Sequence, residues 1–202
     1  MIQLFETMKS ALERRENVVL CSILASSGSA PRGAGAKMAV FQNGQALGTI
    51  GGGAVERIAA QQATELFQTG ASYCQAFCLA PNQVNDIGMI CGGSVTVYFR
   101  FFDHENARDL ELIKTILELL ASGQDAWLVS RMEDGKIAAM GTFDEAHGLR
   151  FAELDETMLR PWLTSSAVYR KGEPSYYVEP ISRAGRVYVF GGGHVGKALV
   201  PV

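Results

Sequence analysis

The chain has 202 residues, which is enough for one substantial domain of about 100–150 residues and part of a second. Apolar residues make up 48% of the chain and charged residues 19%, the balance of a globular protein with a core. The net charge is −3 and no run of Lys and Arg is longer than two residues, so the basic surface of a nucleic-acid-binding protein is excluded.

Two further classes of protein are disfavoured by the sequence. No apolar run reaches the roughly 18–20 residues of a membrane span, and residues 1–15 are charged and amphipathic rather than a signal peptide. We therefore expect a cytoplasmic protein without a membrane span. Four cysteines do not make a disulfide framework in a chain of this length, and no second Cys or His pair accompanies Cys74 and Cys78 to form a zinc site. We expect free thiols.

The chain opens with a helix and a buried strand. Apolar residues recur at helical spacing from Ile2 to Leu12, which predicts an amphipathic helix. Val18–Leu24 is an almost continuous apolar run, typical of a strand buried on both faces. Cys21 lies within that run, so we expect it to be an inert core residue.

A loop and a hairpin follow. Ser26–Gly35 has the composition of a loop, and Arg32 in it and Lys37 just after it are candidate anion ligands. Strands are predicted at Met38–Phe41 and Ala46–Ile50, because the Asn-Gly pair between them is a strong hairpin signal. The hairpin could bring Arg32 to the same edge of the sheet as the glycines that follow it.

Three consecutive glycines connect this hairpin to a predicted helix, Ala54–Phe67, which Gly70 should end. Their backbone N–H groups and the helix N-terminus should face one point, which predicts an anion or cofactor cradle at Gly51, Gly52 and Gly53. A tight turn without a ligand is the alternative. Glu56 lies in the first helical turn, where the helix dipole favours a carboxylate, so a ligand-binding and a structural role both stay open.

A second glycine-rich stretch, Asp86–Gly93, contains Cys91. Two glycines, Gly92 and Gly93, follow the cysteine and precede a predicted strand, Ser94–Phe102. Backbone N–H donors and access at such a turn can lower a thiol pKa, so Cys91 is a candidate nucleophile or sulfur carrier, although a lone cysteine is more often structural. The preceding predicted strand, Tyr73–Leu79, should bury Cys74, Ala76 and Cys78 on one side.

The remaining elements complete an α/β fold with a mixed sheet. We predict a helix at Leu110–Leu120, followed by two strands around a turn, Ala126–Arg131 and Ile137–Phe143. A turn-rich stretch, Asp144–Gly148, precedes a short helix at Asp155–Trp162. Two further strands are predicted at Val168–Arg170 and Tyr176–Ile181. Pro174 and Pro180 should confine the last strands to sheet edges or strand ends. The helix–strand–hairpin order occurs twice, which hints at an internal repeat.

The last eighteen residues have a different character. A strand, Arg186–Phe190, precedes Gly191, Gly193 and Gly196, which fit the G-x-G-x-x-G fingerprint of a dinucleotide-binding turn. We divide the chain into an α/β domain, 1–184, and the first strand and turn of a Rossmann-like domain, 185–202. A complete binding unit needs about 30 residues and a later acidic residue, so we do not expect NAD(P) binding by this chain.

Four motifs in this order resemble the XdhC/CoxI family, accessory proteins of xanthine dehydrogenase and related molybdenum hydroxylases. The resemblance rests on Gly28-Ser-Ala-Pro-Arg-Gly, Gly48-Thr-Ile-Gly-Gly-Gly with Glu56, Gly88-Met-Ile-Cys-Gly-Gly and the terminal Gly-Gly-Gly-His-Val-Gly. It implies a cytoplasmic chaperone that binds molybdenum cofactor (molybdopterin), protects it while a cysteine desulfurase supplies sulfur, and delivers it to the molybdenum hydroxylase apoprotein. We also expect a homodimer.

The resemblance also assigns roles to residues. It implies that Arg32 and Gly51–Gly53 meet the pterin phosphate or the oxo groups, and that Cys91 lies near molybdenum as a sulfur relay or transient metal ligand. Two other functions remain open. One is an NAD(P)-dependent oxidoreductase, which Gly191–Gly196 favours although no acid–base motif accompanies it. The other is a small-molecule-binding or scaffold protein without a cofactor.

Overall fold

A single large sheet organises the molecule. The computed structural model describes residues 1–27, 32–78, 93–182 and 193–194. Its helices are α1 (Ile2–Glu13), α2 (Gly53–Thr69), α3 (Ala107–Ser122) and α4 (Glu156–Leu159), the last continuing into a 3-10 turn, η1 (Arg160–Trp162). Its strands are β1 (Val18–Ser27), β2 (Lys37–Phe41), β3 (Ala46–Gly48), β4 (Tyr73–Cys78), β5 (Ser94–Phe102), β6 (Ala126–Glu133), β7 (Lys136–Asp144), β8 (Gly148–Arg150), β9 (Val168–Arg170) and β10 (Ser175–Ser182).

The ten strands follow the order β3-β2-β1-β5-β4-β7-β6-β10-β9, and β8 pairs with β7. The predicted α/β fold with a large sheet and flanking helices is confirmed. Every pairing between the described strands is antiparallel, whereas the sequence predicts mixed directions. The reason is that strands adjacent in sequence, such as β1 and β2 or β6 and β7, pair directly with each other.

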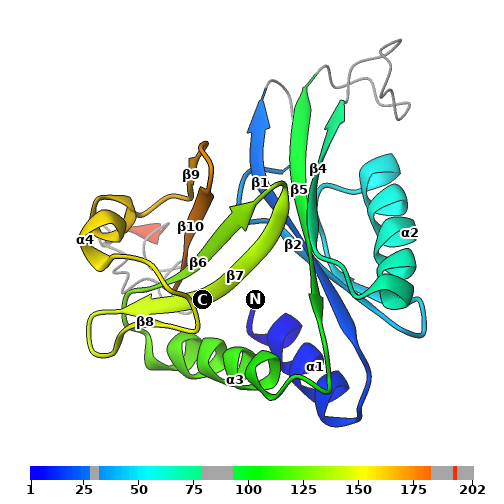
Figure 1. The fold of residues 1–202 in the computed structure, drawn as a ribbon, viewed down its shortest axis with the longest axis horizontal. Coiled ribbons are helices and arrows are strands. Elements are labelled where there is room, and N and C mark those ends of the chain that lie inside the picture. Colours follow the sequence, from blue (N-terminus) through cyan, green and yellow to red (C-terminus); the bar gives the residue numbers. More distant parts are fainter. Residues whose placement is uncertain (28–31, 79–92, 183–192, 195–202) are drawn as a thin grey trace.

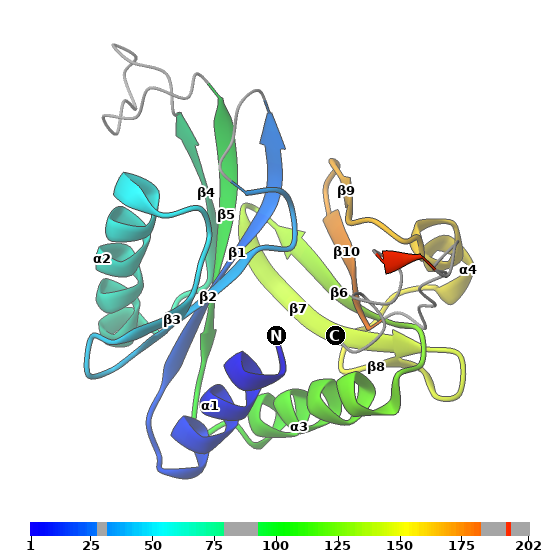
Figure 2. The same cartoon turned by 180° about the vertical axis from the view of Figure 1, so that it is seen from behind.

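The sheet is bent so that its two halves face each other (Figures 1 and 2). The halves are β1–β5 and β6–β10, and they are joined by a single paired position, Tyr73 with Lys136. Across the interior, the Tyr177 hydroxyl of β10 donates to the Ile23 carbonyl of β1 at 3.2 Å. β10 of the second half of the sheet therefore contacts β1 of the first half.

The described apolar side chains form two large core clusters and a smaller one between α4 and the strands β6, β7 and β10. α1 and α3 pack together beneath the bent sheet, and α2 covers the outer face of the first half (Figure 2). The helical spacing seen in the sequence corresponds to these contacts. The buried apolar residues of α1 and α3 are Leu4, Phe5, Met8, Ala11, Leu12, Leu112, Ile113, Ile116 and Leu119. Each large apolar side chain buried in this way stabilises the fold by about 1.5–3 kcal/mol. None of the described helices is long and apolar enough to cross a membrane.

Most predicted elements are confirmed, and β1 is the clearest case. Val18–Leu24 is buried along its whole length because β2 and β5 flank it and helices cover the sheet. β10 lies inside the sheet rather than at its edge, but β9 pairs only with Tyr176–Val178, so Pro180 lies beyond the end of that ladder. The missing N–H of the proline therefore breaks no bond to β9.

Three predictions on local structure are corrected. β3 ends at Gly48 rather than Ile50, because the Ile50 N–H turns to a side chain, as described below. Ala76 is exposed and Cys74 only half-buried, because Phe77 is the residue of β4 that packs into the core. The turn-rich stretch after Phe143 contains an unexpected strand, β8, which pairs with the end of β7.

Candidate functional site

The glycine turn, Thr49–Gly52, is closed by the side chain of Glu56. The Glu56 carboxylate accepts the N–H groups of Ile50 at 2.9 Å, Gly51 at 3.2 Å and Gly52 at 2.8 Å, and it also accepts the Thr49 hydroxyl. All four contacts use the same oxygen, Oε1. The N–H groups of the turn thus bind an anion, and in this structure that anion is the side chain of Glu56.

This arrangement explains the protonation state of the carboxylate. Burial raises the pKa of Glu56, but hydrogen bonds from Thr49, Gly52, Ile50 and Gly51 outweigh burial and leave the pKa below its ordinary value. Glu56 is therefore fully ionised at neutral pH. Its charge also lies in the first turn of α2, where the helix dipole favours an anion.

Glycine is required in this segment for two different reasons. Gly52 precedes α2 with φ of +78°, a conformation that side chains rarely adopt, although a Cβ built there would meet no atom within 4 Å. At Gly48, φ is +90° and a Cβ would lie 2.5 Å from the Lys37 carbonyl oxygen. Gly52 is thus needed for its backbone conformation, and Gly48 also for close contact with β2.

The loop that carries Arg32 ends beside the glycine turn. The Thr49 N–H donates to the Lys37 carbonyl at 2.8 Å, and Met38 pairs with Gly48, so both segments lie at one end of the β2–β3 hairpin. Gly35 fixes the loop to β1, because its N–H donates to the Ile23 carbonyl at 2.9 Å. Arg32 is exposed, and no described residue forms a hydrogen bond or ion pair with it.

Lys37 has a different role from the one that the sequence suggests. Its ammonium group forms an ion pair with Glu179 of β10 and donates to the Gly35 carbonyl at 3.3 Å. Both side chains of the ion pair are 3% exposed. Lys37 is therefore committed to an internal partner and is not available on the loop as an anion ligand.

Glu179 is the site residue that sequence reasoning missed. Its second carboxylate oxygen lies 3.2 Å from the Tyr177 hydroxyl, and a cavity of about 380 Å³ lies between Glu179, the loop at Ala34 and Gly35, and the segment 165–167. The sequence does contain one signal for Glu179, because it is an acidic residue within a short apolar strand. A carboxylate buried in such a strand requires a partner. The position of that partner, 142 residues away, has no local signal.

Several predicted site residues lie outside the described part of the chain, namely Cys91, Gly92, Gly191 and Gly196. Gly93 is described and is buried just before β5, whereas Gly193 is exposed. Burial raises the pKa of the described thiols, Cys21 strongly and Cys74 to about 11, so neither is suited to sulfur chemistry. Among the described residues, no cluster of His, Cys, Asp and Glu could hold a metal ion.

Comparison with known proteins identifies the segment that carries this geometry. Residues 11–77, from the end of α1 to β4, match the model of the XdhC and CoxI family. The family match thus covers the Arg32 loop, the β2–β3 hairpin, the glycine turn and α2, and it confirms the resemblance seen in the sequence.

A solved structure supports the fold over a longer range. The chain is similar to a crystal structure described as a xanthine dehydrogenase from Bacillus halodurans, with a TM-score of 0.70 and 19% sequence identity. The similarity covers 90% of this chain and 52% of that protein, so the XdhC/CoxI-like chain spans about half of its length. At this identity the likeness concerns the fold. A comparison with curated proteins gives no match.

Proposed function

We propose that the chain is part of an accessory protein that binds molybdenum cofactor and assists its sulfuration and insertion into a xanthine dehydrogenase-type hydroxylase. The observation that carries the proposal is the contact between the glycine turn and the start of β2, which follows the Arg32 loop in the chain. The Thr49 N–H donates to the Lys37 carbonyl at 2.8 Å. Both segments lie within the part of the chain that matches the XdhC and CoxI family.

The residues near this hairpin end fit an anionic cofactor in a specific way. Arg32 is exposed and has no partner among the described residues, and a guanidinium group suits the bidentate recognition of phosphate. The N–H groups of Gly51 and Gly52 are occupied by Glu56, so they do not offer a phosphate site while that carboxylate stays in place. We therefore assign the phosphate contact to Arg32.

Glu56 and the glycine turn then have a positioning role. By accepting four hydrogen bonds on one oxygen, Glu56 fixes the turn between the end of β3 and the start of α2. The glycines leave the surface of the turn free of side chains, so a ligand can approach the main chain. When bound, the cofactor would supply the molybdenum centre at which an oxo ligand is replaced by sulfur.

The remaining assignments complete the proposal. Cys91 is proposed as the sulfur relay or transient molybdenum ligand, because it precedes two glycines at a predicted turn, where backbone N–H donors and access would favour a thiolate. The partners would be a cysteine desulfurase and the hydroxylase apoprotein, in the cytoplasm, with the chain acting as a homodimer. NAD(P) has no part in this proposal.

Activation of a hydroxylase apoprotein tests this function. The apoprotein is incubated with molybdenum cofactor, cysteine desulfurase and this chain, and the appearance of hydroxylase activity is measured with and without the chain. We expect the chain to increase activity, Cys91→Ser to remove the increase and Cys91→Ser to keep the wild-type thermal midpoint. Equal activity with and without the chain would contradict an accessory role.

Cys21→Ser is the matched control in the same assay. Cys21 is fully buried in β1, so the serine hydroxyl would be placed in the core at a cost of about 1–3 kcal/mol. We expect this variant to lower the thermal midpoint while the folded fraction still activates the hydroxylase. Full activation by Cys91→Ser would instead remove Cys91 from the sulfur chemistry.

A further inference from the structure

A second polar cavity lies between the two halves of the sheet, and most of its lining residues follow the segment that matches the family. Two adjoining hollows of about 330 and 440 Å³ share the side chain of Arg100 and the β7 residues Ala138, Ala139 and Met140. We call the combined space the basic cleft. It is bounded by β5, the N-terminal end of α3, β7 and the segment that follows β8.

The topology of the sheet opens this cleft. β4 and β7 pair at one position only, so β7 leaves the first half of the sheet immediately after Lys136. β7 also bulges there, because Ala139 pairs with Arg131 and Ile137 with Met132, which leaves Ala138 without an opposite residue. Bulges are common beside functional sites because they redirect side chains. The small side chains of Ala138 and Ala139 leave space in the wall of the cleft.

The cleft concentrates positive charge on a chain whose net charge is −3. Its walls carry four cationic side chains, Arg100, Arg108, Arg131 and Lys136, and two acidic ones, Asp109 and Glu153. A third carboxylate, Glu133, pairs with Arg131. These cations come from β5, α3, β6 and β7, so the fold and not a local run in the sequence brings them together. The N-terminal end of the 16-residue helix α3 adds its positive dipole end on the same side.

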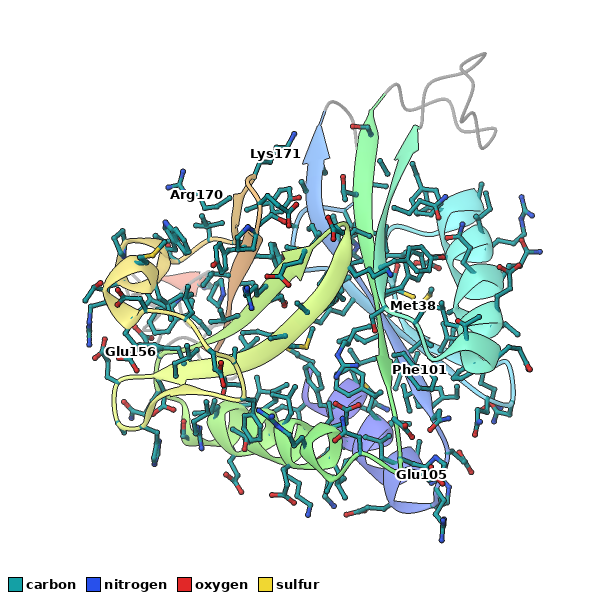
Figure 3. All side chains as sticks on the ribbon, in the orientation of Figure 1. Met38, Phe101, Glu105, Glu156, Arg170 and Lys171 are labelled. Atoms are coloured by element: carbon teal, nitrogen blue, oxygen red, sulfur yellow. The ribbon has the colours of Figure 1, made fainter. Side chains whose placement is uncertain are left out.

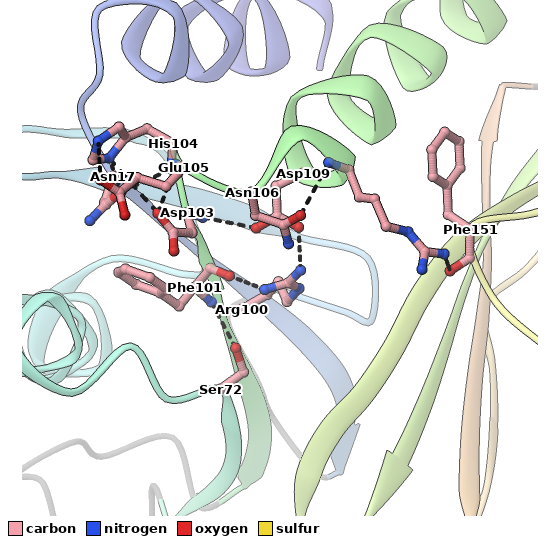
Figure 4. A network of polar contacts seen from close by, with 11 residues as sticks. Asn17, Ser72, Arg100, Phe101, Asp103, His104, Glu105, Asn106, Asp109 and Phe151 are labelled. Carbon is pink, nitrogen blue, oxygen red and sulfur yellow. Dashed lines mark hydrogen bonds and ion pairs between the residues drawn. The ribbon is translucent and has the colours of Figure 1, made fainter.

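The arginine deepest in the cleft is held in place. Arg100 is 20% exposed, and it bonds Asp109 at 2.6 Å and donates to the Phe101 carbonyl (Figure 4). Its guanidinium group also stacks over the Phe102 ring, 4.8 Å from the ring centroid. Asp109 is itself fixed, because it accepts the Asp103 N–H at 2.8 Å. The ion pair neutralises the buried carboxylate of Asp109. Because these contacts already restrict the Arg100 side chain, it would lose less conformational entropy on binding a ligand.

The rim arginines are attached less tightly. Arg108 donates to the Phe151 carbonyl at 3.3 Å, which links α3 to the far wall of the cleft. Arg131 pairs with Glu133 on its own strand, and both side chains of that pair are more than a third exposed. Each guanidinium group has five N–H donors, so these contacts leave donors for an additional anion.

We propose that the basic cleft binds a small ligand bearing a phosphate or pyrophosphate group. Three planar guanidinium groups around one cavity suit tetrahedral oxyanions, which they can bind bidentately. The cavity volume lies in the range of small-molecule sites, about 300–1,000 Å³. The site is separate from the Arg32 loop and the glycine turn, so it does not depend on the function proposed above.

Titration calorimetry with inorganic pyrophosphate tests the proposal. We expect wild-type protein to bind pyrophosphate and the double variant Arg108→Gln/Arg131→Gln to bind at least tenfold more weakly. The matched control is Arg57→Gln/Arg170→Gln, which removes the same charge from α2 and β9. Arg170 projects from the outer end of β9 in Figure 3, away from the cleft. This control should bind like wild type.

The outcomes separate a built site from general charge attraction. Equal weakening by both double variants, or no binding to wild type up to about 10 mM pyrophosphate, would overturn the proposal. A phosphoserine peptide that binds more than tenfold more tightly than pyrophosphate would also overturn it, because the cleft would then be a protein-docking surface. Thermal midpoints of both variants within a few degrees of wild type show that weaker binding comes from the lost side chains.

Discussion

At the scale of single residues, Glu56 shows how a glycine-rich motif can be stabilised by a carboxylate from its own helix. A carboxylate that accepts three backbone N–H groups and a hydroxyl supplies the partners that the residues before α2 would otherwise lack. The motif therefore contains both the cradle and its anion. Sequence reasoning left the two roles of Glu56 open, because spacing alone does not show where a side chain turns.

Glu56→Gln tests this structural role. The amide keeps the shape of the side chain but lacks the charge, so we expect a loss of about 1–2 kcal/mol in the free energy of unfolding, discounted for partial exposure. Urea denaturation measures the loss, and Glu65→Gln on the exposed face of α2 is the control. A Glu56→Gln variant as stable as the control would mean that these hydrogen bonds contribute nothing.

The same carboxylate predicts a pH dependence. Its pKa in the folded state is below the ordinary value of 4.5, so the unfolded state binds its proton more readily. The stability from Glu56 is present above about pH 4.5 and is lost as the pH falls through the lowered pKa. The stability difference between wild type and Glu56→Gln should therefore shrink with acidification. A difference that grows with acidification would contradict the assignment.

At the scale of elements, the Lys37–Glu179 ion pair connects β2 to β10 across the bent sheet. Both side chains are almost completely buried, and removal of one partner leaves the other charge unpaired in the core. Lys37→Met should lower the free energy of unfolding by about 3–5 kcal/mol, measured by urea denaturation. The double variant Lys37→Met/Glu179→Leu should recover much of that loss. A loss in the double variant equal to the sum of both single losses would contradict the pairing.

The sequence predicted individual elements better than their contacts. Apolar spacing located α1, α2 and α3, and the continuous run at Val18–Leu24 correctly indicated a strand buried on both faces. The bend of the sheet was not predictable, because it depends on the single β4–β7 pairing and on contacts between residues far apart in the chain. For the same reason the basic cleft, built from four elements, has no local sequence signature.

At the scale of the whole molecule, the fold places two distinct polar sites on the bent sheet. One is the site proposed at the end of the β2–β3 hairpin, where the start of β2, which follows the Arg32 loop, pairs with the end of β3, which precedes the glycine turn. The other is the basic cleft between the halves. The candidate site could be located from sequence motifs, but the assignment of Arg32 rather than the glycine N–H groups to the phosphate depended on the position of Glu56.

The molybdenum content of the purified protein tests this assignment most directly. Wild type, Arg32→Gln and Arg170→Gln are produced in cells that make molybdenum cofactor, and the molar ratios of molybdenum and pterin to protein are measured. Both arginines are exposed, so neither change should alter stability by more than about 0.5 kcal/mol. We expect wild type and Arg170→Gln to retain cofactor equally and Arg32→Gln to retain at least tenfold less. Equal retention by all three proteins, or no cofactor in wild type, would contradict the account.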